Sequence, residues 1–265
     1  MAFVSWLLFA KGRLVFLHSL VSRCYCRVSC ILRTTAQEFI EVFFPRSCVN
    51  CGIYTVRDAA LCVSCINNIK FLQGCFCIKC GKNLEQNAGV CVRCTAFNSH
   101  LSALESVFEY DDTSKHMVLQ FKFYGDISNI KTYAGWMFEK GKELLARVDL
   151  IVPVPMHCMR LRQRKYNQSV LLARALSKLC GIPLEVFTLK KEKNTTPQSH
   201  LSASKRSKNV WNSFKVTNSV LFRGKVVVLI DDVVTTGASL QECARVLKNS
   251  GAKEVIGLTL ARTMS

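Results

Sequence analysis

The chain has 265 residues, of which 49% are hydrophobic and 20% are charged. This composition excludes disordered, collagen-like and low-complexity proteins, and no apolar run reaches the roughly 18 residues typical of polytopic membrane proteins. The formal net charge of +18 favours anionic partners such as nucleic acid, phosphates or an anionic membrane.

The first 33 residues are apolar and basic, with five Lys or Arg and no acidic residue. Lys11-Gly12-Arg13 interrupts the apolar stretch too early for a spanning helix, and the charge follows that stretch, whereas a signal peptide carries its charge first. A basic amphipathic segment on an anionic membrane, an organelle presequence and a translation start placed too far upstream remain open. We favour the last, because recognisable domain sequence begins near Thr34. Residues 34–44 then predict a short helix that ends before Pro45.

Fifteen cysteines are present, and eight of them form four CxxC pairs. The pairs are Cys48/Cys51, Cys62/Cys65, Cys77/Cys80 and Cys91/Cys94. The segments starting at Cys48 and Cys77 share every cysteine position, with a glycine after each first pair (Gly52 and Gly81), so they form an internal repeat with an offset of 29 residues. Cys75 is out of register with this repeat and is predicted to be a spare thiol.

This repeat predicts two sequential four-cysteine zinc sites, because Zn²⁺ favours four tetrahedral thiolates and each CxxC turn supplies two. The glycines permit a positive φ, which turns backbone N–H groups toward the sulfurs. Segments this short bury little core, so metal would supply much of their folding free energy. A disulfide framework and an iron–sulfur cluster are the alternatives, and one or two structural zinc ions are expected.

Strands and helices alternate from about residue 101 onward. The predicted strands are 104–110, 150–154, 185–189, 213–216, 225–230 and 254–259, and the predicted helices are 114–123, 127–145, 168–179 and 238–250. This order predicts an α/β fold with a mostly parallel sheet covered on both faces. Ligands of such sheets bind at the carboxyl ends of the strands.

The segment VVVLIDDVVTTGASL, residues 226–240, lies at such an end. An apolar strand leads into Asp231-Asp232, and a loop of small and hydroxyl residues then leads into a helix. Free amides, hydroxyls and the positive helix end suit a phosphomonoester, and the two adjacent carboxylates suit the vicinal hydroxyls of a ribose. Neither a P-loop nor a GxGxxG fingerprint is present.

This segment resembles the signature of type I phosphoribosyltransferases, which bind 5-phosphoribosyl 1-pyrophosphate with Mg²⁺. Together with the CxxC repeat it resembles, more narrowly, the ComF family of competence proteins, including ComFC and GntX-like members. The resemblance runs from about Thr34 to Arg262 and includes FKFYGD (121–126), VPVP (152–155), RLRQRKYNQ (160–168) and TPQSHLSASKRSKN (196–209). It implies a double zinc ribbon at 34–100 and a phosphoribosyltransferase-like domain at 101–265, which leaves residues 1–33 as a basic apolar extension.

The resemblance also implies the binding residues of phosphoribosyl pyrophosphate. Asp231 and Asp232 would hold the ribose, and Val154, Pro155 and Met156 would form the pyrophosphate loop. The 5-phosphate would bind Thr235, Thr236, Gly237, Ala238 and Ser239. Arg164 would meet pyrophosphate oxygens, as Arg160 and Arg162 also could. Relatives usually read RGFNQ where this chain has Arg164 to Gln168, so the missing glycine puts the path and closure of this loop in question.

ComF-like proteins handle single-stranded DNA in the cytoplasm during natural transformation, and the resemblance implies that role here, without a stable membrane span and with helicase or recombination factors as partners. The candidate DNA-binding residues are Arg160, Arg162, Lys165, Tyr166, Lys205, Arg206 and Lys208, with Trp211 as a further stacking surface. Two alternatives remain. One is a true phosphoribosyltransferase, amidophosphoribosyltransferase-like, that acts on a base or amine. The other is a regulator that senses phosphoribosyl pyrophosphate.

Overall fold

The computed structural model describes residues 47–55, 59–84, 89–96, 99–123, 128–193 and 210–264. The predicted extension at 1–33, the helix at 34–44 and three candidate DNA-binding residues (Lys205, Arg206 and Lys208) lie outside the described residues. The eight cysteines of the repeat and the whole segment 226–240 lie within them.

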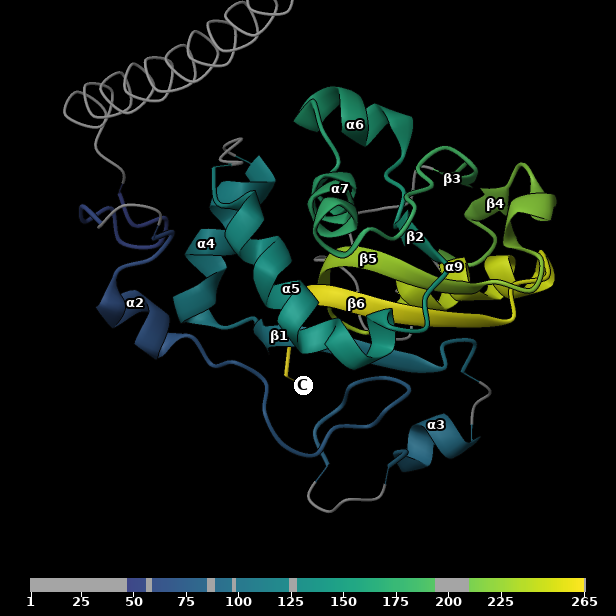
Figure 1. Ribbon diagram of the computed structural model, residues 1–265, viewed down its shortest axis with the longest axis horizontal. Helices are drawn as coiled ribbons and strands as arrows, with labels where there is room; N and C mark the ends of the chain where they lie inside the picture. The colour runs from purple at the N-terminus through teal and green to yellow at the C-terminus, as the bar shows by residue number, and fades with distance from the viewer. Residues whose placement is uncertain are drawn as a thin grey trace, which may run out of the picture.

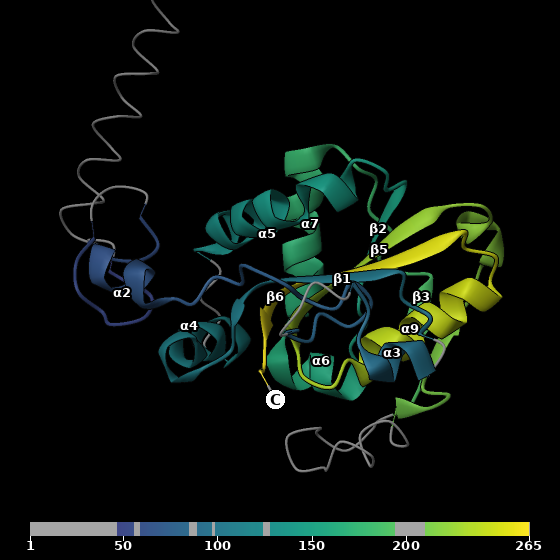
Figure 2. The same cartoon turned by 90° about the horizontal axis from the view of Figure 1, so that it is seen from below.

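A four-stranded parallel sheet forms the centre of the molecule, with the order β1-β6-β5-β2. Its strands are β1 (Ala103–Glu109), β2 (Leu150–Pro153), β5 (Val226–Val234) and β6 (Glu254–Arg262). Helices α5 (Ile130–Leu145) and α7 (Gln168–Cys180) lie on one face, and α9 (Ala238–Asn249) lies on the other (Figures 1 and 2). Helix α4 (Asp112–Phe123) follows β1 and packs into the same core as α5 and α7. The predicted parallel, doubly covered α/β sheet is confirmed.

Burial on both faces explains why β5 is apolar throughout its first five residues. Val226, Val228 and Ile230 belong to the core that contains α5 and α7. Val227 and Leu229 belong to the core that contains α9. Since successive side chains of a strand point to opposite faces, a strand between two helical layers cannot alternate apolar with polar residues.

The predicted strand at 185–189 is wrong. Only an isolated bridge between Ile151 and Leu184 extends the main sheet there. The Glu185 carboxylate then accepts the N–H groups of Phe187 (2.7 Å) and Thr188 (2.8 Å), which turns the chain out of an extended path. The strand that follows, β3 (Leu189–Lys191), pairs with β4 (Phe214–Val216) in a separate antiparallel sheet, so the predicted strand at 213–216 lies outside the main sheet.

Further differences concern the ends of elements and short helices. Strand β5 continues to Val234, through both aspartates, and β6 continues to Arg262, because the two strands remain paired to that point. The helices α6 (Cys158–Arg164) and η2 (Ser219–Phe222) were not predicted. Their brevity leaves little periodic signal.

The cysteine repeat folds twice into the same local structure, as a first ribbon (residues 47–68) and a second ribbon (residues 76–96). The first contains α2 (Val63–Asn68) and a bridge between Ser47 and Tyr54, and the second contains α3 (Val92–Ala96) and a bridge between Phe76 and Asn83. Each bridge and helix recurs with the 29-residue offset of the sequence. The first ribbon lies near α4, whereas the second lies at a separate place beside the sheet (Figures 1 and 2).

Candidate functional site

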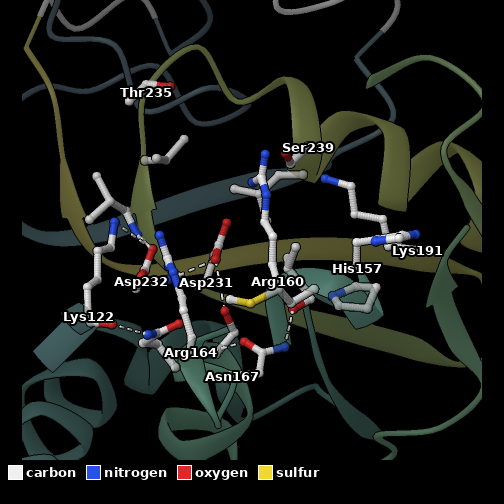
Figure 3. A pocket seen from close by; sticks show the side chains of 18 of the residues that line it. Lys122, His157, Arg160, Arg164, Asn167, Lys191, Asp231, Asp232, Thr235 and Ser239 are labelled. Atoms are coloured by element: carbon white, nitrogen blue, oxygen red, sulfur yellow. Dashed lines mark hydrogen bonds and ion pairs between the residues drawn. The ribbon is translucent and has the colours of Figure 1, made fainter. Parts of the chain in front are cut away.

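The two aspartates at the end of β5 lie within the strand pairing rather than in a free loop. Asp231 is paired with Thr259 of β6, so the backbone position of the carboxylates is fixed by the sheet. The Asp231 carboxylate accepts the hydroxyl of Ser169 (2.9 Å) from the first turn of α7. The Asp232 carboxylate pairs with Lys122 Nζ of α4 (3.3 Å), as Figure 3 shows. Each acid is therefore positioned by a different helix.

The surroundings of Asp231 change its charge. Burial, and after it the charge of Asp232, raise the pKa of Asp231 from its ordinary 3.8 to about 7, while the Ser169 hydroxyl acts in the opposite direction. Near neutral pH, Asp231 is thus divided between its acid and its carboxylate forms. A pair that carries less than two full charges can both donate a hydrogen bond to a ligand and accept one from it.

This pKa predicts how stability depends on pH. Between about pH 4 and pH 7 the unfolded chain releases the Asp231 proton while the folded chain retains it, so the free energy of unfolding falls as the pH rises. Asp231→Asn should flatten this slope and raise the melting temperature at pH 7.5. Thermal unfolding of the unmodified protein and of Asp231→Asn from pH 4.5 to 7.5 measures this slope. An unchanged slope in the variant would contradict the raised pKa of Asp231.

A phosphate-sized cradle follows the aspartates directly. Gly237 precedes α9 with a φ of +76°, and no side chain caps the helix N-terminus there. The hydroxyl Oγ1 of Thr236 is buried and has no hydrogen-bond partner among the described residues. Free helical N–H groups beside a buried unpartnered hydroxyl suit an anion with several acceptor oxygens.

Cationic side chains form the opposite wall of the site. Arg160 and Arg164 come from α6, and Lys191 comes from β3 (Figure 3). Arg164 lies over the ring of Phe123 at 4.6 Å. Burial and then the charge of Arg160 lower the pKa of Lys191. The positive charge on this wall is therefore larger than the nearby acids neutralise. This wall would gain stability from an anionic ligand.

These walls enclose a pocket of about 420 Å³, within the usual range for small-molecule sites. Every predicted ligand-binding residue except Thr236 lines it, namely Asp231, Asp232, Thr235, Gly237, Ala238, Ser239, Val154, Pro155, Met156 and Arg164. The structure thus brings together segments that lie up to 85 residues apart in the sequence, from Val154 to Ser239. Of the residues that the structure describes, four Lys or Arg and two aspartates line this space.

Several lining residues were missed by the sequence reasoning, notably Lys122, His157 and Ser169. Lys122 belongs to the FKFYGD segment, which contributes to the family resemblance but carries no predicted binding role. His157 accepts the Met159 N–H at 3.3 Å and so begins α6. Nothing local in the sequence marks Ser169 as a partner of Asp231.

The predicted DNA-binding residues divide into two groups. Arg160 lines the pocket, whereas Arg162 and Lys165 are exposed outside it. Tyr166 is half-buried, and its hydroxyl donates to the Phe121 carbonyl at 2.7 Å, so its ring is a supporting group rather than a free stacking surface. Lys165 occupies the position of the glycine of relatives and adopts a left-handed φ of +66°, so the turn after α6 forms here without glycine.

The eight cysteines form two groups in which all four Sγ atoms lie within 4.8 Å of one another, and none of the eight is in a disulfide. In each group one Sγ pair is 3.7 Å apart, Cys51 to Cys62 and Cys80 to Cys91. Four sulfurs at about 2.3 Å from a tetrahedral Zn²⁺ would lie about 3.8 Å from each other, so the groups fit this ion. Gly52 and Gly81 adopt positive φ, as predicted. Backbone N–H groups of Cys65 and Cys91 point at the sulfurs of Cys62 and Cys77.

Comparison with known proteins agrees with this architecture. The family model of the double zinc ribbon domain matches residues 39–95, and that of the phosphoribosyl transferase domain matches residues 166–265. Competence protein F of Haemophilus influenzae is 30% identical over 227 residues, which cover 83% of this chain and 98% of the relative. The chain belongs to the ComF family. This ComF-family chain thus joins a double zinc ribbon to a phosphoribosyltransferase-type domain.

Other known proteins are similar to this chain over only part of its length. DNA utilization protein YhgH of Salmonella typhi is 38% identical over 116 residues, which cover 44% of the ComF-family chain and 50% of that protein. The purine phosphoribosyltransferase of Pyrococcus horikoshii is a structural neighbour with a TM-score of 0.34 and 22% identity, covering 51% of this chain and 73% of that one. Among the described residues, none of the helices combines the length and the apolar character required to cross a bilayer.

Proposed function

We propose that the pocket at the end of β5 binds phosphoribosyl pyrophosphate with Mg²⁺, and that the chain handles single-stranded DNA during DNA uptake. The observation that carries the first part is the continuous order of two sheet-anchored carboxylates and a helix N-terminal cradle, facing a cationic wall. Asp231 and Asp232 would bind the ribose hydroxyls, residues 235–239 the 5-phosphate, and Arg160, Arg164 and Lys191 the pyrophosphate. Mg²⁺ would enter with the ligand and offset part of the pyrophosphate charge.

Calorimetry tests this binding. Titration with phosphoribosyl pyrophosphate and Mg²⁺ should give a saturable heat, and ribose 5-phosphate should bind more weakly because it leaves the cationic wall without a partner. Release of pyrophosphate only when a base or an amine is added would identify a transferase, whereas binding without release would identify a sensor or a DNA-handling protein. No heat with pure folded protein would refute the ligand assignment.

The second part of the proposal depends on charge and on one aromatic surface. The chain carries a formal charge of +18, and a partial relative is named a DNA utilization protein. Trp211 is 57% exposed, and Arg245 lies against its ring at 4.6 Å. Arg245 is itself held by Glu242 and by the Asn212 side chain, both through its Nη2 atom. The outer face of a ring fixed in this way is suited to stacking on a nucleobase.

Fluorescence anisotropy with a labelled single-stranded oligonucleotide tests the DNA part. If about four phosphates are contacted, affinity should fall roughly 50-fold between about 50 and 200 mM salt. Trp211→Ala should weaken binding by about 5- to 150-fold, because stacking contributes about 1–3 kcal/mol per base, while Trp211→Phe should retain most of the affinity. Binding that is no stronger at low salt than that of a neutral control protein would refute direct DNA handling.

The two parts are separable by mutation. Asp231→Ala together with Asp232→Ala should remove binding of the sugar phosphate and leave the salt-sensitive DNA binding in place, since Trp211 is not among the residues that line the pocket. Joint loss of both activities in a variant that melts normally would instead indicate that the pocket itself binds DNA.

A further inference from the structure

Arg262, the last residue of β6, carries a buried charge that pairs with no carboxylate of the described residues. The residue is 8% exposed, and its Nη1 atom is buried without a hydrogen-bond partner among the described residues. None of the ion pairs found within the described ranges includes it. A buried guanidinium is costly unless an anion or a set of acceptors compensates it, so this side chain requires a partner.

The second ribbon lies directly against this guanidinium. A Cβ placed on Gly81, the residue after Cys80, would be 2.7 Å from Arg262 Nη1. Burial lowers the pKa of Arg262, and the four cysteines of the second cluster (Cys77, Cys80, Cys91 and Cys94) act in the opposite direction. The guanidinium thus lies beside the turn that follows the second thiol of this cluster.

We propose that Arg262 is the counterion of the zinc centre in the second ribbon. Zn²⁺ bound by four thiolates has a net charge of −2, which is the compensation that the buried guanidinium lacks. The glycine at position 81 leaves room for the guanidinium to approach the sulfurs. In the first ribbon the Asn50 amide donates to Cys65 Sγ at 3.6 Å, and among the described residues nothing lies within 4 Å of a Cβ placed on Gly52, the counterpart of Gly81. The surroundings of the two centres thus differ despite their shared sequence pattern.

The position of Arg262 connects the metal centre with the rest of the domain. Its backbone is paired with Val234 of β5, the residue before the loop at 235–239, and its carbonyl accepts the Tyr110 N–H at 2.6 Å. A backbone bond from Leu104 N–H to the Ile78 carbonyl (2.7 Å) fixes the second ribbon to β1 nearby. Through Arg262 the second zinc centre would support the end of β6.

Zinc release to a chromophoric chelator tests the proposal. In Arg262→Met, one of the two zinc ions should leave about 10- to 100-fold faster, the effect typical of removing a group that supports metal ligands, while the other keeps its rate. The zinc release rate of Arg262→Lys should lie between those of the unmodified protein and Arg262→Met, because lysine keeps the positive charge. Arg147→Met is the matched control, since Arg147 pairs with Glu254 at the opposite end of β6 (2.7 Å).

Alkylation of the released thiols followed by peptide mapping identifies the centre that opens. The proposal expects the peptides with Cys77 to Cys94 to be labelled first in Arg262→Met. Unchanged release, or equal acceleration at both centres, would overturn it.

The paired glycines provide a second test that does not alter the arginine. Gly52 and Gly81 have φ of +76° and +67°, so alanine introduces the same backbone strain at both. At Gly81 the new Cβ would meet Arg262 Nη1 (2.7 Å) and the Leu104 carbonyl oxygen (3.2 Å), whereas nothing among the described residues lies within 4 Å of a Cβ at Gly52. Gly81→Ala should therefore accelerate zinc loss from its own centre several-fold more than Gly52→Ala does from the first, and this excess should shrink in an Arg262→Met background, where only the Leu104 contact remains. Equal acceleration would argue against the counterion role.

Discussion

Asp231→Asn combined with Asp232→Asn should abolish the calorimetric signal of phosphoribosyl pyrophosphate with Mg²⁺. A hydrogen bond from a sugar hydroxyl to a charged carboxylate contributes about 1.5–3 kcal/mol, so each single change should weaken binding by about 10- to 150-fold. Folding should survive, because Asn at position 231 can still accept the Ser169 hydroxyl and removes a buried group of raised pKa. Asp232→Asn leaves Lys122 without its partner and should lower the melting temperature by a few degrees.

Asp149→Asn is the matched control for this experiment. Asp149 lies beside the opposite end of β5, where its carboxylate accepts the Val226 N–H at 2.8 Å, and it is not among the residues that line the pocket. The affinity of Asp149→Asn for phosphoribosyl pyrophosphate should equal that of the unmodified protein. Full binding by the double variant would exclude the end of β5 as the ribose site.

Cys77→Ser should lower the zinc content from about two ions to about one per chain and should destabilise the phosphoribosyltransferase-type domain as well as the second ribbon. Structural zinc contributes about 10–16 kcal/mol of apparent binding free energy in small ribbons, so losing one thiolate removes most of the stability of that segment. Because Arg262 would then be buried without an anion, the expected fall in melting temperature is larger than for Cys48→Ser.

Metal analysis and calorimetric melting measure both effects. Cys75→Ser is the control, because Cys75 belongs to neither cluster and its loss should leave the zinc content unchanged. Folded ribbons in a preparation without zinc, or a smaller effect of Cys77→Ser than of Cys48→Ser, would contradict the prediction.

The parts of the site that the sequence predicted are those encoded contiguously. Residues 226–240 contain the strand, the acids, the loop and the start of α9 in one segment, so a local pattern describes one whole wall. The zinc ligands were likewise predictable, because CxxC spacing and a glycine define each turn without reference to the rest of the chain.

The remaining wall depends on contacts between distant segments, which no local pattern contains. Lys122 reaches Asp232 only because α4 packs beside the end of β5, and Lys191 enters the pocket only because β3 leaves the main sheet. Strand 185–189 was mispredicted for a related reason, since the side chain of Glu185 bonds the following backbone and competes with strand pairing. Arg262 lies in an otherwise apolar strand end, and its partner comes from a repeat more than 150 residues earlier.

The extended conformation of β5 across both acids has a consequence for which sugars the pocket can accept. Asp231 and Asp232 both line the pocket, and their partners Ser169 and Lys122 come from α7 and α4, which pack into the same core. A ligand that binds both carboxylates would offer one hydroxyl to each. Within a DNA strand the 2′-hydroxyl is absent and the 3′-oxygen is esterified, so its sugars offer no free hydroxyl to either acid, and the pocket should distinguish a free ribosyl metabolite from the nucleic acid itself.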